Sequence, residues 1–268
     1  MPIDIELITI FLTLGVAVGF MAGLFGVGGG GIMVPVLTLV FGFYGIGGEN
    51  GVHLALGTSM ASIVVTSFSS LRSHHSHSAV IWSVVQKMTP GILLGTFLAT
   101  FLVSLLSPKF LALFFAGFMF VVAVQMVLNL KPRNHGKEAG VLQLFMAGNF
   151  IGAISAIVSI GGGTMTVPYL MWNNVDIKKA IGTAAAIGFP ISIAGTLGYI
   201  VNGWQKTSQE NYTIGFVYLP AVVLISLVSF FTAPIGAKVA HKLPISTLKK
   251  VFALLLVALS LKMLFSVI

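Results

Sequence analysis

The chain carries a series of apolar runs that are each long enough to cross a lipid bilayer. A spanning helix needs about 20 predominantly apolar residues. Eight segments approach or exceed this length, at 7–27, 54–71, 79–106, 110–130, 141–160, 180–201, 214–237 and 248–267. Two further segments, 32–44 and 165–172, are too short to span. Only 7% of the 268 residues are charged, against about 25% in a soluble domain. The sequence therefore predicts an all-α, polytopic membrane protein with eight long transmembrane helices and two short ones.

The two short segments each follow a cluster of glycines, and the surroundings of the two clusters resemble each other. When the chain is shifted by 133 residues, segment 19–37 lies over segment 152–170 with seven identities in 19 positions. An Ala-x-Gly-Thr sequence follows in each half, at 55–58 and 180–183. Short sequences that recur in the same order indicate an internal duplication. Each half then contains five elements, in the order long, short, long, long, long.

An odd number of elements per half places the second half upside down in the membrane, as in the inverted repeats of many transporters. The predicted organisation is a first repeat at 1–130, a cytoplasmic linker at 131–140 and an inverted second repeat at 141–268. If each long-short pair returns to its starting side, eleven of the 14 Lys and Arg fall on one face. Because cytoplasmic loops carry the basic excess, both termini are predicted outside. The net charge of +8 is then a topology signal rather than evidence for nucleic acid.

The glycine clusters predict an anion site. Non-helical backbone at membrane depth persists only where protein or a wet cavity surrounds it, and a helix that begins there presents unpaired N–H groups with a partial positive charge. Two such helix N-termini near the midplane suit an anionic substrate. The predicted substrate-binding residues are Gly28, Gly29, Gly30, Gly31, Thr58, Ser59, Gly161, Gly162, Gly163, Thr164 and Thr183. The predicted structural hinges are Pro35, Pro168, Gly57 and Gly182.

Other interpretations of these residues stay open. The glycines could serve only close helix packing, and the hydroxyls of the Gly-Thr sequences could bond to the carbonyl four residues earlier in their own helix. The sequence His74-His75-Ser76-His77 is interpreted as a solvated loop beside Arg72 rather than as a metal site. No metal or cofactor is predicted, because the chain has no Cys and no intramembrane pair of histidines at ligand spacing.

The duplicated Gly-Gly-Gly followed by Val-Pro, each with its downstream Ala-x-Gly-Thr, resembles the sulfite exporter TauE/SafE family of membrane transporters. The resemblance covers residues 7–267 and implies a permease of the inner (plasma) membrane for small sulfur-containing anions, such as sulfite, thiosulfate or organosulfonates. Thr164 stands where the first cluster has its fourth glycine, so the two half-sites are not expected to be equivalent.

The expected function is secondary transport, not an enzyme activity, by alternating access around the site between the two glycine clusters. A passive anion channel, or a membrane-embedded metal-dependent enzyme that uses the histidines, are the alternatives. The expected partners are the anionic substrate and membrane lipid. Apolar helix faces can serve lipid or a second copy of the chain, which leaves a homo-oligomer open.

Overall fold

The computed structural model describes residues 4–128, 140–207 and 212–242, with isolated positions beyond at 244, 246, 254, 257, 258, 260 and 261. The helices are α1 (Ile5–Phe25), α2 (Gly30–Tyr44), η1 (Gly48–Asn50), α3 (Gly51–Ser76), α4 (Trp82–Leu105), α5 (Pro108–Leu128), α6 (Val141–Val158), α7 (Gly163–Trp172), α8 (Ile177–Gly203) and α9 (Leu219–Lys242). Two short antiparallel strands, β1 (Thr213–Ile214) and β2 (Val217–Tyr218), form a hairpin before α9.

Seven of the described helices are long and apolar enough to cross a bilayer: α1, α3, α4, α5, α6, α8 and α9. They match the first seven long segments predicted, and α2 and α7 match the two short ones. The all-α, polytopic fold class is therefore confirmed. The predicted span at 248–267 and the linker at 131–140 lie outside the described residues, apart from isolated positions.

The structure corrects two predicted boundaries. Helix α3 continues to Ser76, so the loop predicted for the histidine-rich sequence is wrong, whereas His75, Ser76 and His77 are exposed as predicted. The span predicted from Ile214 begins instead at Leu219, because the preceding residues form the hairpin. The hairpin residues Phe216 and Val217 are buried in the interior. The predicted boundary is too early because buried apolar residues of a hairpin have the same composition as the first residues of a transmembrane helix.

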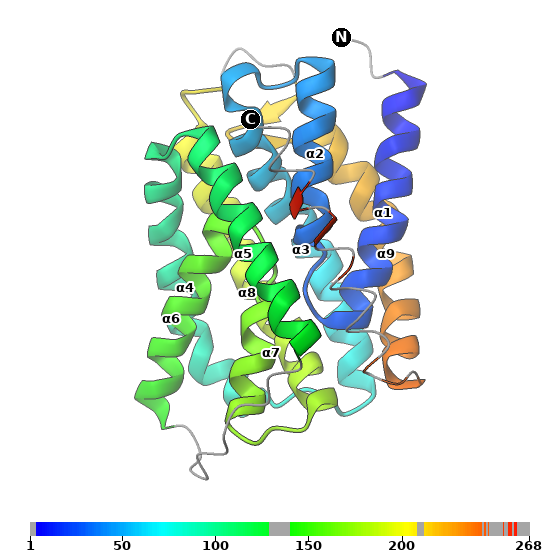
Figure 1. Ribbon diagram of the computed structural model, residues 1–268, viewed down its shortest axis with the longest axis vertical. Helices are drawn as coiled ribbons and strands as arrows, with labels where there is room; N and C mark the ends of the chain where they lie inside the picture. The colour runs from blue at the N-terminus through cyan, green and yellow to red at the C-terminus, as the bar shows by residue number, and fades with distance from the viewer. Residues whose placement is uncertain are drawn as a thin grey trace.

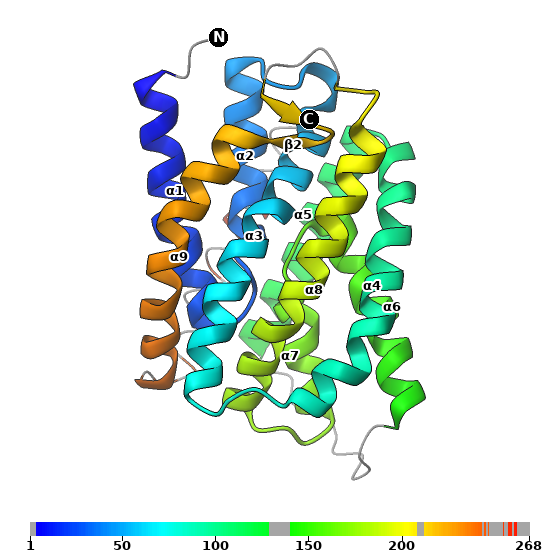
Figure 2. The same ribbon diagram turned by 180° about the vertical axis from the view of Figure 1, so that it is seen from behind.

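The helices run between two opposite ends of the molecule (Figures 1 and 2). Helix α1 begins at the upper end in Figure 1 and α2 returns to that end, whereas α6 begins at the lower end and α7 returns to it. The closest helix pairs are α1 with α9, α4 with α6 and α3 with α8. The short helices α2 and α7 pack on α3 and α8, respectively. Both turns between a long and a short helix therefore lie within the molecule.

Glycines set the closest of these helix contacts. On α1, Gly15, Gly19 and Gly23 recur every four residues, and a Cβ at any of them would collide with the α9 backbone. Gly91 and Gly95 of α4 face the backbone of α6 in the same way. This is the close approach that small residues at four-residue spacing allow between membrane helices.

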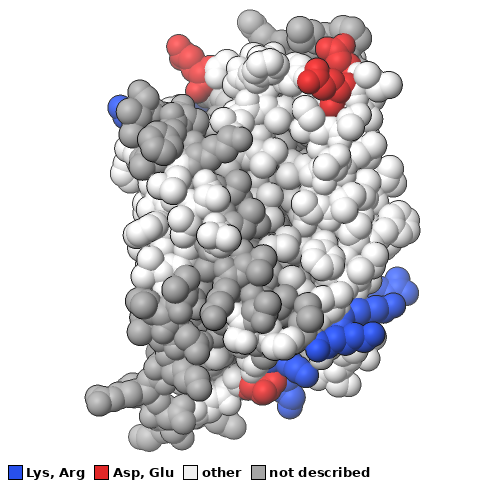
Figure 3. All heavy atoms as spheres, turned by 45° about the vertical axis from the view of Figure 1, so that its right-hand side comes forward, with Lys and Arg blue, Asp and Glu red and all other residues white. Residues whose placement is uncertain are grey.

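The charged side chains separate toward the two ends, and an uncharged belt lies between them (Figure 3). The lower end, which we call the basic end, carries Arg72, Lys87, Lys178, Lys179, Lys238 and Lys242. The opposite end carries Asp4, Glu6 and Glu49, with Lys109 and Lys206. Charge is thus kept out of the part of the molecule that would face hydrocarbon.

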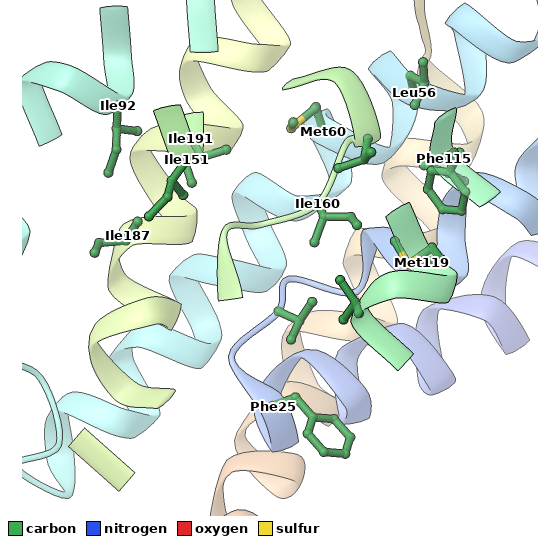
Figure 4. Close-up of a cluster of buried hydrophobic side chains, with 14 of the residues drawn as sticks. Phe25, Leu56, Met60, Ile92, Phe115, Met119, Ile151, Ile160, Ile187 and Ile191 are labelled. Carbon is green, nitrogen blue, oxygen red and sulfur yellow. The ribbon is translucent and has the colours of Figure 1, made fainter. Parts of the chain in front are cut away.

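Buried apolar side chains fill the interior (Figure 4). Ile160, on the connection between α6 and α7, belongs to one cluster with Met60 of α3 and with Phe115 and Met119 of α5. Phe25, at the end of α1, belongs to the same cluster. The core therefore packs directly against the segments where the two long helices end.

Candidate functional site

The first glycine cluster reverses the chain between α1 and α2. Helix α1 is capped by Gly26, whose backbone is left-handed (φ 67°) and whose N–H donates to the Ala22 carbonyl at 2.9 Å. Gly28 and Gly29 are also left-handed, with φ of 74° and 83°, and Gly29 caps α2. This conformation is costly for residues with a Cβ. We call residues 26–31 the first break.

The second glycine cluster makes the corresponding reversal between α6 and α7. Helix α6 is capped by Ser159, whose backbone is left-handed (φ 51°) although the residue has a side chain. Its hydroxyl donates to the Leu56 carbonyl, and its own carbonyl accepts from the Ser59 hydroxyl at 3.4 Å. Gly162 (φ 69°) caps α7. These bonds tie residues 159–163, the second break, to α3.

The two breaks touch through their backbones. The Gly161 N–H donates to the Val27 carbonyl at 3.1 Å. A Cβ on Gly28 would lie 3.0 Å from the Cα of Gly161, and one on Gly30 would collide with the carbonyl oxygen of Ser159. The structure therefore brings the two predicted glycine clusters together, and close packing is one reason for glycine at these positions.

The breaks differ in how their N–H groups are used. The N–H groups of residues 161–163 donate to the carbonyls of Val27, Ile160 and Gly161 at 2.8–3.1 Å. In contrast, the N–H groups of residues 28–31 have no acceptor among the described residues, although all four residues are buried. Buried backbone donors are normally paired, and these lie at a helix N-terminus. The first break is thus the stronger candidate for holding an anion.

Serine hydroxyls lie close to the breaks. Ser59 bonds to the second break as described, and Ser67, two turns further along α3, lies beside Gly188 of α8. The Ser67 hydroxyl is 3.5 Å from that of Ser192 on α8. The sequence prediction included Ser59 but missed Ser67 and Ser192. The signal for Ser67 is its spacing of eight residues from Ser59, which places both on one face of a helix.

The predicted threonines have backbone partners in the other half of the chain. The Thr58 hydroxyl accepts the N–H of Tyr218 at 2.9 Å, and the Thr183 hydroxyl accepts the N–H of Ile81 at 3.0 Å. The alternative bond to a carbonyl of their own helix does not occur among the described residues. Each threonine therefore anchors the segment that leads into α9 or α4.

The glycines before these threonines permit the same contacts. A Cβ on Gly57 would collide with the carbonyl oxygen of Phe216, and one on Gly182 would lie 2.5 Å from that of Ala79. Their hinge role stays a prediction, but each glycine is needed for close backbone approach. Thr164, at the start of α7, is half-buried.

The two predicted hinge prolines lie inside the short helices. Pro35 and Pro168 are each six residues into α2 and α7, counting from Gly30 and Gly163. Each lacks the N–H that would bond to the carbonyl four residues earlier. Both prolines therefore lie in the second turn of their helices, beyond the first turn, where a proline removes no helical hydrogen bond.

Two buried histidines hold the ends of α3. His53 Nε2 donates to the Val103 carbonyl at 3.1 Å, and His74 Nε2 donates to the Gly23 carbonyl at 2.9 Å. His74 is completely buried, which is the reverse of the solvated position predicted for it. The signal that could have found it is the recurrence of Ser62, Thr66, Ser70 and His74 every four residues.

The fold and the paired breaks define a polytopic membrane protein of the transporter class, and comparisons with known proteins agree. A family model described as "Sulfite exporter TauE/SafE" matches residues 11–263. The chain belongs to the sulfite exporter TauE/SafE family. A "Probable membrane transporter protein" of Haemophilus influenzae is 37% identical over 257 residues, which cover 96% of this chain and 97% of the relative.

More distant relatives extend the same description. A relative from Methanocaldococcus jannaschii is 27% identical, and the alignment covers 88% of this chain and 88% of the relative. A relative from Bacillus subtilis is 25% identical, and the alignment covers 91% of this chain and 93% of the relative. Both are described as probable membrane transporter proteins. No solved structure matches the chain. The protein is accordingly a membrane transporter by family.

Proposed function

We propose that the protein is a secondary transporter for small sulfur-containing anions, such as sulfite, thiosulfate or organosulfonates. The family description names sulfite, and anions of this class present several oxygens that accept hydrogen bonds. The observation that carries the proposal is the row of four buried N–H groups at residues 28–31 that have no acceptor among the described residues.

The chemistry around the first break suits an anion. Successive N–H groups at a helix N-terminus point toward a negative ligand, and the helix dipole adds to the attraction. The hydroxyls of Ser59, Ser67 and Ser192 lie nearby, and each donates to a backbone carbonyl in this conformation, so each would have to rotate to donate to an anion. The four acidic residues of the described part lie near the ends of the molecule, so none would repel an anion at the breaks.

Matching contacts in the two halves support alternating access by an inverted repeat. Gly57 and Thr58 hold the segment before α9, while Gly182 and Thr183 hold the segment before α4. The pairs α1–α9 and α6–α4 correspond in the same way. One half can then rock against the other around the breaks. The basic end is proposed to face the cytoplasm, across the plasma membrane.

Counterflow in proteoliposomes tests the proposal. Vesicles loaded with unlabelled sulfite, thiosulfate or an organosulfonate should accumulate the same labelled anion transiently, and chloride should not replace it. A carrier gives this exchange because its site faces one side at a time. Linear, unsaturable flux without exchange would instead show a passive channel, and no flux of any of these anions would refute the substrate class.

A further inference from the structure

Helices α3 and α9 end at the basic end (Figures 1 and 2). Three imidazole rings lie close together there. His74 in the last turn of α3 and His241 in the last turn of α9 lie edge to face, with ring centroids 5.4 Å apart. His77, which follows α3, is stacked on His241 at 4.6 Å. We call these residues the histidine cluster. Within the described part of the chain no three His, Asp or Glu are placed to hold a metal ion. We therefore consider the proton as the cation that these imidazoles bind.

Two ring nitrogens of the cluster are buried without a partner. His74 Nε2 donates to the Gly23 carbonyl, so Nδ1 carries the lone pair of the neutral ring. That Nδ1 atom is buried and has no hydrogen-bond partner among the described residues, and the same is true of His241 Nε2. His77 instead uses Nδ1 to donate to the Ser73 carbonyl at 2.8 Å. His74 Nδ1 is therefore a free, buried proton acceptor.

The charged groups near the cluster are mostly basic. Lys178 of α8 places Nζ 3.5 Å from the His241 carbonyl. Asp176, the acidic residue at this end of the described chain, accepts the backbone N–H of Lys178 at 2.9 Å and makes no described bond to an imidazole. The part of α1 that follows Gly23 contributes no titratable side chain. The other titratable or charged groups on the packed elements are exposed: Arg72, His75, Lys179, Lys238 and Lys242.

A proton added to His74 fits the observed packing poorly. The new N–H at Nδ1 would be a buried donor without an acceptor, which is unfavourable. The positive ring would also face the His241 imidazole, which is itself stacked on His77 and has the Lys178 ammonium at its carbonyl. No carboxylate among the described residues is bonded to the His74 ring. The charged ring is better accommodated in a conformation where it reaches water, and that movement releases the Gly23 carbonyl.

The link from His74 to the first break is short. Gly23 lies three residues before Gly26, where α1 ends and the break begins. The Ser70 hydroxyl, one turn earlier on α3, donates to the Ala22 carbonyl at 3.4 Å. These two bonds hold the end of α1 against α3. Release of the histidine therefore loosens the segment whose N–H groups have no acceptor among the described residues.

We propose that the histidine cluster is a proton-binding site, and that proton uptake there separates α1 and α9 from α3 and opens the first break toward the basic end. A ligand that binds one conformation more tightly shifts the population toward it, and the coupling is reciprocal. The consequence for transport, which rests on the proposed function, is co-transport of a proton with the anion. The anion then supplies the negative charge that the cluster lacks.

Spin-label distances test the proton site without any assumption about substrate. The chain has no Cys, so Ser83→Cys on α4 and Ile235→Cys on α9 can carry labels without background. Both residues are exposed and lie toward the basic end, outside the cluster. Between about pH 8 and pH 5, where imidazole changes charge, a longer distance should become populated as the pH falls. For one coupled proton, the ratio of the two populations changes by up to about tenfold per pH unit.

Two matched variants identify the residue responsible. His74→Gln keeps an N–H donor for the Gly23 carbonyl but does not titrate, so the pH response should disappear. His75→Gln alters an exposed neighbour that bonds to Trp82, and its response should match the unaltered sequence. If His74→Gln fails to fold, His241→Gln should show the same loss. A full response in folded His74→Gln, or no response in the unaltered sequence, would overturn the proposal.

A transport experiment distinguishes a failure of the proton site from a failure of the proposed function. An imposed pH gradient should drive thiosulfate accumulation in proteoliposomes, and His74→Gln should abolish the dependence on the gradient. Absence of any anion transport, with pH-dependent distances intact, would refute the proposed function and leave the proton site standing. If anion transport does not depend on the pH gradient in protein whose spin-label distances do respond to pH, the proposed coupling of proton and anion would be overturned.

Discussion

Replacement of Gly30 by alanine tests the backbone contact between the two breaks. Gly30 is the first residue of α2, and its Cβ would collide with the carbonyl oxygen of Ser159 in the second break. The carbonyl oxygen is part of the backbone, so it cannot relieve the collision by a change of rotamer as a flexible side chain can. Gly42 lies in the same helix, and a Cβ there has no heavy atom within 4 Å. Gly42→Ala is therefore the matched control.

The two substitutions should change stability in opposite directions. Alanine is favoured over glycine in a helix interior by up to about 1 kcal/mol, so Gly42→Ala should raise the free energy of unfolding. Overpacking costs about 1–3 kcal/mol, so Gly30→Ala should lower it by that amount. With roughly 2–4 °C per kcal/mol for a chain of this size, a difference of about 1–4 kcal/mol should separate the two midpoints by about 2–16 °C.

Thermal denaturation of the detergent-purified variants, followed by loss of the folded peak in size-exclusion chromatography, measures this difference. The unaltered protein should fall between the two variants. Equal midpoints for Gly30→Ala and Gly42→Ala would show that the breaks are not in backbone contact, and the account of the site would fail.

Further predictions concern the anchoring threonines and the orientation in the membrane. Thr58→Val should lower the free energy of unfolding by about 1–3 kcal/mol, because the buried Tyr218 N–H loses its acceptor. Thr58→Ser should retain stability in the same denaturation assay, and Thr183→Val should repeat the loss; unchanged stability in both valine variants would contradict the anchoring role. A cysteine at Phe43, which is exposed on α2, should react with a membrane-impermeant maleimide on intact cells, whereas one at Lys238 should react only after permeabilisation. The opposite labelling pattern would reverse the proposed orientation.

The spans and the breaks could be predicted because hydrocarbon imposes a length on apolar helices and glycine marks where they stop. The end of α3 could not be predicted in the same way. Its last three turns carry Ser67, Ser70 and His74, which resemble a solvated segment in composition. Those side chains are buried because they bond to other helices. Hydropathy does not distinguish a polar face turned inward from one turned to water.

The contents of the site were only partly predictable for a related reason. The clusters at residues 28–31 and 161–163 follow from sequence, but which N–H groups stay free depends on the crossing of the two breaks. Thr58 shows the same limit. Its partner, Tyr218, is 160 residues away in sequence, so local pattern suggested only a ligand or its own helix as a partner.

Anion affinity of two variants at Gly31 tests the central claim most directly. Gly31→Pro removes one of the four N–H groups that have no acceptor among the described residues. Residue 31 lies in the first turn of α2, where proline is tolerated, and Gly31→Ala retains the N–H. A hydrogen bond to a charged group contributes about 1.5–3 kcal/mol, so Gly31→Pro should weaken binding of sulfite or thiosulfate by roughly 10- to 150-fold. Gly31→Ala should bind close to the unaltered protein. Equal affinities for the proline and alanine variants, measured by calorimetry on folded protein, would contradict an anion site built from the backbone of the first break.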